Sequence, residues 1–218
     1  MSAPVLHLQG VDHRVGPRFT LRVPSLTIGP GVTAVLGPNG SGKSTLLRLL
    51  ATVVAPATGT FTVGGAAPDG PALVGVRRRL GYLPQDDSVP RRLTAFDHVD
   101  LVAVMRELAD DPRRRRAMVH RALLDQQLED LAGERCGRLS GGQRRRVAIA
   151  ATLAGDADLL VLDEPDAHLD DDHRARLAAL LTRRGESATV VVATHDRAWI
   201  EAFADRAVHV VDGMAGAA

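Results

Sequence analysis

The chain has 218 residues, of which 45% are hydrophobic and 24% charged, and its 27 Lys and Arg residues nearly balance its 26 Asp and Glu residues. This composition is typical of a soluble globular protein and excludes a disordered, collagenous or coiled-coil chain. A net charge of +1 provides no general attraction to nucleic acid or anionic lipid, and a single cysteine excludes an internal disulfide and a cysteine-built zinc site.

The N-terminal part predicts short strands that lead into a glycine loop and a helix. Gly and Pro turn signals separate the apolar stretches, which predicts strands at 5–8, 19–23, 26–28, 32–36, 59–63 and 80–83. After the glycine loop, leucines at helical spacing predict a helix over 44–51.

The composition of the sequence changes between residue 94 and about residue 138. Glycine becomes rare there, and apolar residues recur at helical intervals, which predicts helices. Asp111-Pro112 interrupts this segment, and Pro112 is expected to begin a helix. A helix after Gly141-Gly142, strands at 159–163, 189–194 and 207–211, a helix at 172–183 and a frayed tail from Gly213 to Ala218 are predicted next. The alternation of strands and helices predicts an α/β fold with a mainly parallel sheet covered on both faces.

No apolar run approaches the ~20 residues of a membrane span. The N-terminus also lacks the basic-then-apolar pattern of a secretory signal. We therefore expect a cytoplasmic protein that meets a membrane only through a partner.

The pattern Gly37-x4-Gly42-Lys43-Ser44 matches a phosphate-binding P-loop (Walker A), and Lys43 is the only lysine of the chain. Glycines let backbone N–H groups surround phosphate oxygens at the start of a helix, the lysine reaches the β- and γ-phosphates, and the serine hydroxyl binds Mg²⁺. The residues expected to bind nucleotide here are Gly37, Pro38, Asn39, Gly40, Ser41, Gly42, Lys43, Ser44 and Thr45.

A second motif, Leu159-Leu160-Val161-Leu162-Asp163-Glu164, places two carboxylates at the end of a buried strand (Walker B). Asp163 is expected to hold Mg²⁺, and Glu164 to act as general base on the attacking water. Together the two motifs indicate a P-loop nucleotidase.

Three further segments narrow this class. Leu139-Ser140-Gly141-Gly142-Gln143, called the signature segment below, opens a helix with a serine cap, while Gln85 follows one strand and His195 ends another. In their order along the whole chain, these motifs resemble ATP-binding cassette (ABC) ATPases. The resemblance implies a single domain over 1–218: a RecA-like P-loop NTPase core with a helical subdomain at about 94–154 and a small antiparallel β-region near the N-terminus.

The resemblance also implies roles for individual residues, with ATP and Mg²⁺ as cofactors. Gln85 would sense Mg²⁺ and the γ-phosphate, and His195 would hydrogen-bond the γ-phosphate and orient the attacking water. Ser140, Gly142 and Gln143 would bind ATP held by a second copy of the chain or by a paralogous ATPase, and Asp170 would cross that dimer interface.

Two departures from the family pattern stand out. Val15 occupies the position where an aromatic residue commonly stacks on adenine, with Phe19 and His13 as alternative candidates. In the loop after Walker B, Asp166, His168 and Asp171 replace the usual Thr, Gly and Pro.

We expect an ATPase subunit that energises a separate membrane permease. Export is expected because the runs 81–85 and 93–96 resemble the exporter branch of the family, which includes antibiotic and multidrug efflux systems. A groove near Gln85, lined by Thr94, Phe96 and Val99, is the expected docking place for the permease. The alternative is a soluble ABC-type ATPase of an assembly or division machine. A non-hydrolysing binder is disfavoured because Glu164 and His195 are both present.

Two arginine runs, 113–116 and 144–146, are interpreted as solvated helix faces, and no nucleic-acid partner is expected. Cys136 is interpreted as a small structural residue that Arg135 could make modestly reactive.

Overall fold

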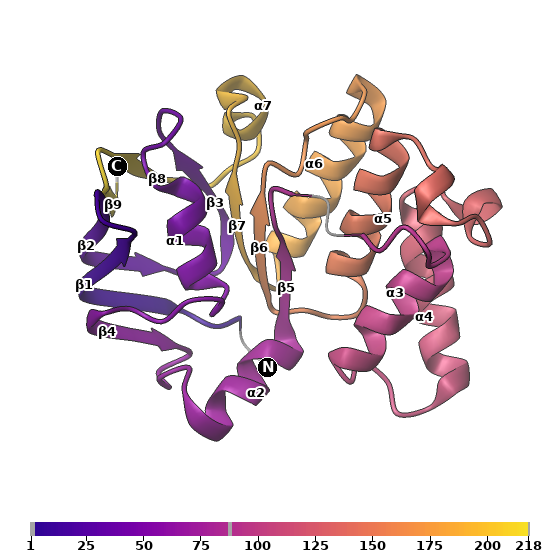
Figure 1. Cartoon of the computed structure of the whole chain (residues 1–218), viewed down its shortest axis with the longest axis horizontal. Helices are drawn as coiled ribbons and strands as arrows, with labels where there is room; N and C mark the ends of the chain where they lie inside the picture. The colour runs from indigo at the N-terminus through magenta and orange to yellow at the C-terminus, as the bar shows by residue number, and fades with distance from the viewer. Residues whose placement is uncertain (1–2, 87–88, 218) are drawn as a thin grey trace.

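The computed structural model describes residues 3–86 and 89–217, which form one nine-stranded sheet with helices on its faces (Figure 1). The strand order is β4-β1-β2-β9-β8-β3-β7-β6-β5. The strands are β1 (Leu6–Val15), β2 (Phe19–Ile28), β3 (Gly31–Leu36), β4 (Thr58–Val63), β5 (Leu80–Leu83), β6 (Leu159–Asp163), β7 (Thr189–Ala193), β8 (Arg206–Val211) and β9 (Met214–Ala217).

The sheet has two parts. Strands β8, β3, β7, β6 and β5 pair in parallel, and β4, β1 and β2 pair antiparallel at the other end. The mainly parallel core and the small antiparallel region that were predicted are both present.

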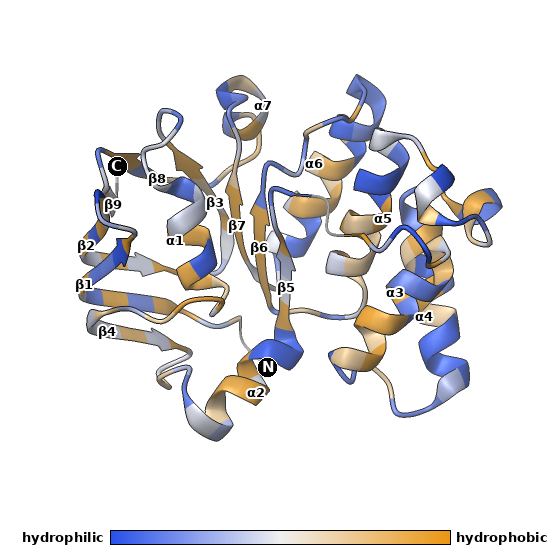
Figure 2. Cartoon of the chain, viewed as in Figure 1, coloured by the Kyte–Doolittle hydropathy of each residue, from blue (hydrophilic) through white to orange (hydrophobic). Residues whose placement is uncertain are grey.

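Every residue of β6 and β7 is buried, because helices cover both faces of the sheet there, and both strands are hydrophobic along their length in Figure 2. The pleat sends alternate side chains to opposite sides. Leu160 and Leu162 join a core with the helices at the right of Figure 1, whereas Leu159 and Val161 join a core with helix α1 (Lys43–Leu50).

Helices α3 (Ala95–Met105), α4 (Pro112–Asp125) and α5 (Gly141–Leu153) pack on one another. Their starts follow the local sequence: Thr94 and Asp97 form a capping box on α3, Asp111 caps α4 with Pro112 in its first turn, and Ser140 and Gln143 form a capping box on α5. Helix α6 (Asp171–Gly185) packs beside β3 and β7. None of the helices in the described part of the chain has the length and apolar character needed to cross a bilayer.

The predicted break at Pro24 is wrong, because β2 runs through it. In the register of β1 and β2, Pro24 lies opposite Gly10, which has a φ of +59°. The pairing continues on both sides of Pro24, since Val23 pairs with Val11 and Ser25 pairs with Gln9.

The predicted frayed tail is wrong for residues 213–217, and Ala218 lies outside the described residues. Asp212 and Gly213 both have positive φ and join Val211 to Met214 in a two-residue hairpin turn, so β9 pairs with β8. Two helices also went unpredicted, α2 (Gly70–Arg79) and α7 (Arg197–Glu201).

Candidate nucleotide-binding site

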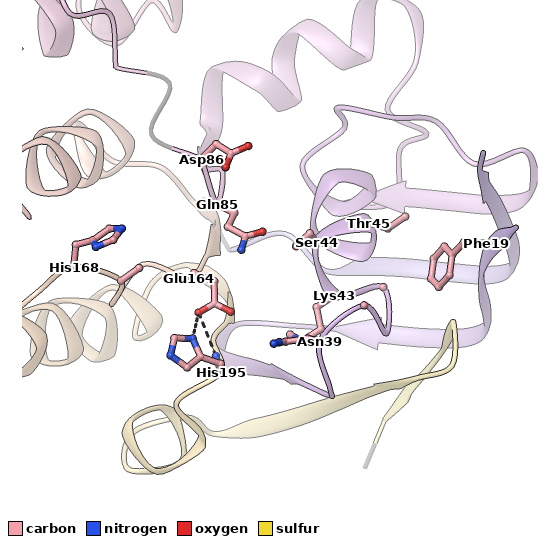
Figure 3. A pocket seen from close by; sticks show the side chains of 13 residues that line it. Phe19, Asn39, Lys43, Ser44, Thr45, Gln85, Asp86, Glu164, His168 and His195 are labelled. Carbon is pink, nitrogen blue, oxygen red and sulfur yellow. Dashed lines mark hydrogen bonds and ion pairs between the residues drawn. The ribbon is translucent and has the colours of Figure 1, made fainter. Parts of the chain in front are cut away.

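The P-loop lies between β3 and α1 and forms one wall of a cavity of about 720 Å³. Predicted residues that line this cavity, called the P-loop cavity below, are Asn39, Gly40, Gly42, Lys43, Ser44, Thr45, Gln85, Glu164 and His195. Phe19, Asp86, Ala167 and His168 complete the lining. Five segments that are separate in sequence therefore converge on one site (Figure 3).

Two glycines of the loop are required by its geometry. Gly42 has a φ of +112°, and a Cβ there would lie 2.8 Å from the Phe19 ring. A Cβ on Gly37 would lie 2.0 Å from the Val210 carbonyl oxygen. Larger side chains would push the loop off the sheet, so only glycine permits this path.

Lys43 folds back on its own loop, where Nζ donates to the carbonyl oxygens of Gly37 at 2.8 Å and Pro38 at 3.1 Å. Gly37 and Pro38 thus contact Lys43 and do not line the cavity, and Ser41 is buried. Lys43 is itself buried at the start of α1. Its positive charge and the N-terminus of the helix therefore both favour an anion at this place.

Asp163 lies at the end of β6 and is 2% exposed. Burial raises its pKa, while a hydrogen bond with the Ser44 side chain opposes that rise. The predicted Mg²⁺ ligands Asp163 and Ser44 are therefore in contact. The third, Gln85, extends its side chain toward Ser44 in Figure 3.

Glu164 and His195 form an ion pair on the wall of the cavity. His195 Nδ1 lies 2.6 Å from Glu164 Oε2, and the backbone N–H of His195 donates to the same oxygen at 3.2 Å. The hydrogen bond and the charge of Glu164 raise the pKa of His195. Glu164 has a φ of +51°, in the left-handed region that is costly for a residue other than glycine.

Arg145 is a residue at the site that the sequence interpretation missed, and the prediction of a solvated face is wrong for it. It is 1% exposed, and Nη2 donates to the carbonyl oxygens of Asp163 at 2.7 Å and Glu164 at 2.6 Å. Nη1 donates to those of Pro84 and Gln85 at 3.1 and 3.4 Å. One side chain of α5 therefore joins the backbones of two cavity walls, and a buried guanidinium with several fixed donors suits that task.

The signature segment lies outside the cavity. Ser140, Gly142, Gln143 and Asp170 do not line it. Gly142 nevertheless approaches the loop after β6, because a Cβ there would lie 2.6 Å from the His168 carbonyl oxygen. Asp170 accepts hydrogen bonds from the backbone N–H and Nδ1 of His173.

Of the three candidates for adenine stacking, only Phe19 lines the cavity. Figure 3 places its ring beyond Lys43 and Thr45, away from Glu164 and His195. His13 is instead 3.0 Å from the Ala55 carbonyl oxygen through Nδ1, and Val15 is exposed.

The comparisons with known proteins agree with this geometry. Residues 21–167 match the ABC transporter family model. The chain belongs to the ABC transporter ATP-binding proteins, which are ATPases.

Relatives include importers and an exporter. The phosphonates import ATP-binding protein PhnC of Anaeromyxobacter dehalogenans is 41% identical over 96% of this chain and 44% of its own length. The macrolide export ATP-binding/permease protein MacB 1/2 of Paracoccus denitrificans is 37% identical over 97% of this chain and 33% of its own. The nickel import ATP-binding protein NikO of Rhodobacter capsulatus is 36% identical over 99% of this chain and 89% of its own length. The chain thus spans less than half the length of the first two.

Solved structures show the same cassette fold. The dimeric structure of MJ0796, a bacterial ABC transporter cassette, has a TM-score of 0.85 and 29% identity over 96% of this chain and 95% of its own. The structure of MJ0796 in a post-hydrolysis state, bound to ADP and Pi, has a TM-score of 0.81 and 26% identity over 97% of this chain and 98% of its own.

Proposed function

We propose that this chain binds and hydrolyses ATP as the nucleotide-binding subunit of an ABC transporter and energises a separate membrane permease. The observation that carries the proposal is the Glu164–His195 pair in the same cavity as Lys43 and Ser44. A phosphate-binding loop and a residue that positions the attacking water are recurring parts of P-loop NTPases, and a carboxylate in contact with an imidazole suits the second task.

Three side chains fit Mg²⁺: Ser44 and Gln85 line the cavity, and Asp163 contacts the Ser44 side chain without lining it. Ser44, Asp163 and Gln85 offer oxygen donors, and within the described residues no group of three or more His, Cys, Asp or Glu side chains could hold a metal alone. A small number of protein ligands is enough for Mg²⁺, because this ion keeps water and phosphate oxygens in its coordination shell. When bound, Mg²⁺ would offset phosphate charge.

In the proposed reaction Lys43 holds the β- and γ-phosphates, and Glu164 accepts a proton from the attacking water. The water oxygen bonds to the γ-phosphorus, and the bond to the β-phosphate oxygen breaks with its electron pair, leaving ADP and phosphate. His195 orients the water and the γ-phosphate through the nitrogen that does not meet Glu164.

The signature segment is proposed to act on ATP held by a second copy. Support comes from its place outside the cavity of its own chain and from the dimeric cassette structure that this chain resembles. A two-fold pair would enclose each ATP between one P-loop and the partner's Ser140, Gly142 and Gln143, with Asp170 near the interface.

The permease is proposed to dock in a groove between β5 and the helices α3 and α5. The expected lining needs correction, because Val99 is fully buried and Phe96 packs against His120 in the helical core. The groove, about 260 Å³ in volume, is instead lined by Pro84, His98, Val102 and Arg106 among other residues.

Arg106 defines the chemistry of the docking segment. Nε and Nη2 of its guanidinium are buried without a hydrogen-bond partner among residues 3–86 and 89–217. Burial, helped by the charge of Arg184, lowers the pKa of Arg106 to about 10. A permease segment with a carboxylate would complement this charge. When a neighbouring-gene membrane protein is co-expressed, we expect membrane co-sedimentation that Arg106→Glu abolishes; retained binding would contradict this docking.

Export is part of the proposal, supported by the resemblance of runs 81–85 and 93–96 to the exporter branch. Relatives of both directions match the chain. ATP-driven uptake of the substrate into inside-out vesicles would indicate export, and ATP-driven uptake into right-side-out vesicles filled with ATP would indicate import.

The hydrolysis proposal is tested with Glu164→Gln. ATP binding should persist by calorimetry, turnover should fall by about 10²-fold or more, and the protein should dimerise with Mg-ATP in analytical ultracentrifugation. Turnover at the wild-type rate would contradict the base assignment, and a monomer at saturating Mg-ATP would contradict the shared site.

A further inference from the structure

Arg174, on the first turns of α6, lies between two loops of the site. Its Nη2 pairs with Oδ2 of Asp196, the residue that follows His195. The same Nη2 lies 3.9 Å from Oδ2 of Asp166, which comes two residues after Glu164. The Asp166 side chain is 4% exposed, so Arg174 is the cation that faces a buried carboxylate. Asp166 Oδ1 has no hydrogen-bond partner in the described part of the chain.

Arg174 also anchors α7. The Trp199 indole N–H donates to the Arg174 carbonyl oxygen at 3.2 Å, and the guanidinium carbon lies 5.9 Å from the centre of the Trp199 ring. Asp196 caps α7 by accepting from the Trp199 backbone N–H at 2.9 Å. Three contacts around one arginine thus fix where α7 begins.

His195 occupies the short link between these constraints. Strand β7 ends at Ala193, and Asp196 is already held by Arg174 and Trp199. His195 therefore has little freedom, and it meets Glu164 through both its backbone N–H and Nδ1.

We propose that Arg174 is a positioning residue for hydrolysis, which holds the Asp196 turn so that His195 contacts Glu164. Arg174 does not line the P-loop cavity. The inference rests on the proposed roles of Glu164 and His195. It predicts a loss in the chemical step with ATP binding preserved, because only the geometry of the pair changes.

Electrostatics provides an independent readout. The carboxylates that face His195 are Glu164, Asp166 and Asp196, and all three raise its pKa. Arg174 pairs with two of them and partly offsets their charge. The Glu164 hydrogen bond is the largest cause of the raised pKa, so loss of Arg174 should lower the pKa of His195 because the contact with Glu164 is lost. A rise would instead mean that the contact persists and that only the offsetting charge is gone.

The test compares Arg174→Met with Arg176→Met, which removes an exposed arginine from the same helix. In Arg174→Met, kcat should fall about tenfold or more while the KM for ATP stays within about twofold. The NMR titration of the His195 imidazole in the nucleotide-free protein, assigned with His195→Gln, should move to lower pH. Arg176→Met should change neither.

A folding defect is separated by a second variant, since Arg174→Met leaves the Asp166 carboxylate buried without its cation. Arg174→Met with Asp166→Asn removes that charge, so the thermal midpoint should recover while kcat stays low. Arg174→Lys should recover part of kcat because it restores a cation.

Two results would overturn the inference: wild-type kcat in folded Arg174→Met, or recovery of kcat together with the thermal midpoint in the double variant. A His195 titration that stays unchanged or moves to higher pH would also count against it. Failure of the proposed function looks different, because Glu164→Gln would then hydrolyse ATP normally whatever the Arg174 variants do.

Discussion

The Arg145 guanidinium donates a hydrogen bond of 2.6 Å to the main-chain oxygen of Glu164. Through this bond and those to Asp163, Pro84 and Gln85, helix α5, which begins at the signature segment, is joined to the proposed base and to the docking groove. A displacement of α5 would therefore reach Glu164 directly.

Arg145→Met should be costly for this reason. Four carbonyl oxygens would lose a charged donor in a buried place, and the free energy of unfolding should fall by about 3 kcal/mol or more in urea titrations. Turnover should fall as well, because the Glu164 backbone loses its support.

The matched control is Arg138→Met, since the Arg138 side chain is 77% exposed. Its free energy of unfolding should change by no more than about 0.5 kcal/mol. Equal effects of the two substitutions would show that the buried contacts of Arg145 contribute little.

Lys43→Ala tests the P-loop. The variant removes the cation proposed to hold the β- and γ-phosphates, so ATP affinity measured by calorimetry should fall about 100-fold or more, as expected for a charge-assisted contact in a partly buried site. The fold should persist in circular dichroism, because in the described part of the chain Lys43 Nζ donates to carbonyl oxygens of its own loop. Unchanged affinity would exclude the role.

Phe19→Ala tests the adenine site. Stacking of a base on an aromatic ring contributes about 1–3 kcal/mol, so ATP affinity should fall about tenfold. His13→Ala and Val15→Ala should have smaller effects, because neither side chain lines the cavity. A larger effect of His13→Ala than of Phe19→Ala would contradict stacking on Phe19 and would place the adenine beside His13 on β1.

Cys136 should resist alkylation in the native protein. It is fully buried, and burial raises the pKa of its thiol, although Arg144 opposes that rise. The expectation that Arg135 could activate it is thus wrong. Iodoacetamide at pH 8 should label the urea-unfolded chain rapidly and the folded chain slowly, and equal rates would contradict the buried position.

The His195–Glu164 pair predicts a pH dependence of stability. Because the folded protein raises the pKa of His195, its stabilising contribution is complete below the ordinary pKa and is lost as the pH rises through the raised one. His195→Gln should therefore lower the thermal midpoint more at pH 5.5 than at pH 9. A difference that grew toward alkaline pH would have the wrong sign.

The sequence predicted the parts of the fold that depend on local pattern. Buried strands β6 and β7 appear as continuous apolar runs, and the starts of α4 and α5 carry their capping residues. The Asp212-Gly213 turn and the Asp69-Gly70-Pro71 start of α2 carry equally clear local signals that the interpretation overlooked.

In the site, the places of Lys43, Asp163 and Glu164 were predictable, because each motif ties its residue to the end of a strand or the start of a helix. Arg145 was not, because three adjacent arginines look alike in sequence and only the packing of α5 decides which one is buried. Arg174 was hidden for a similar reason, since its partners Asp166 and Asp196 lie on separate loops.

The composition of the basic residues has a practical consequence. Lys43 is the only side-chain amine of the chain, and it lies 7% exposed in the P-loop. Acylating reagents and lysine-directed cross-linkers therefore find no surface lysine to modify. Covalent attachment through lysine would report on, or block, the loop proposed to hold the triphosphate, so lysine chemistry is unsuited to tethering this protein to a surface.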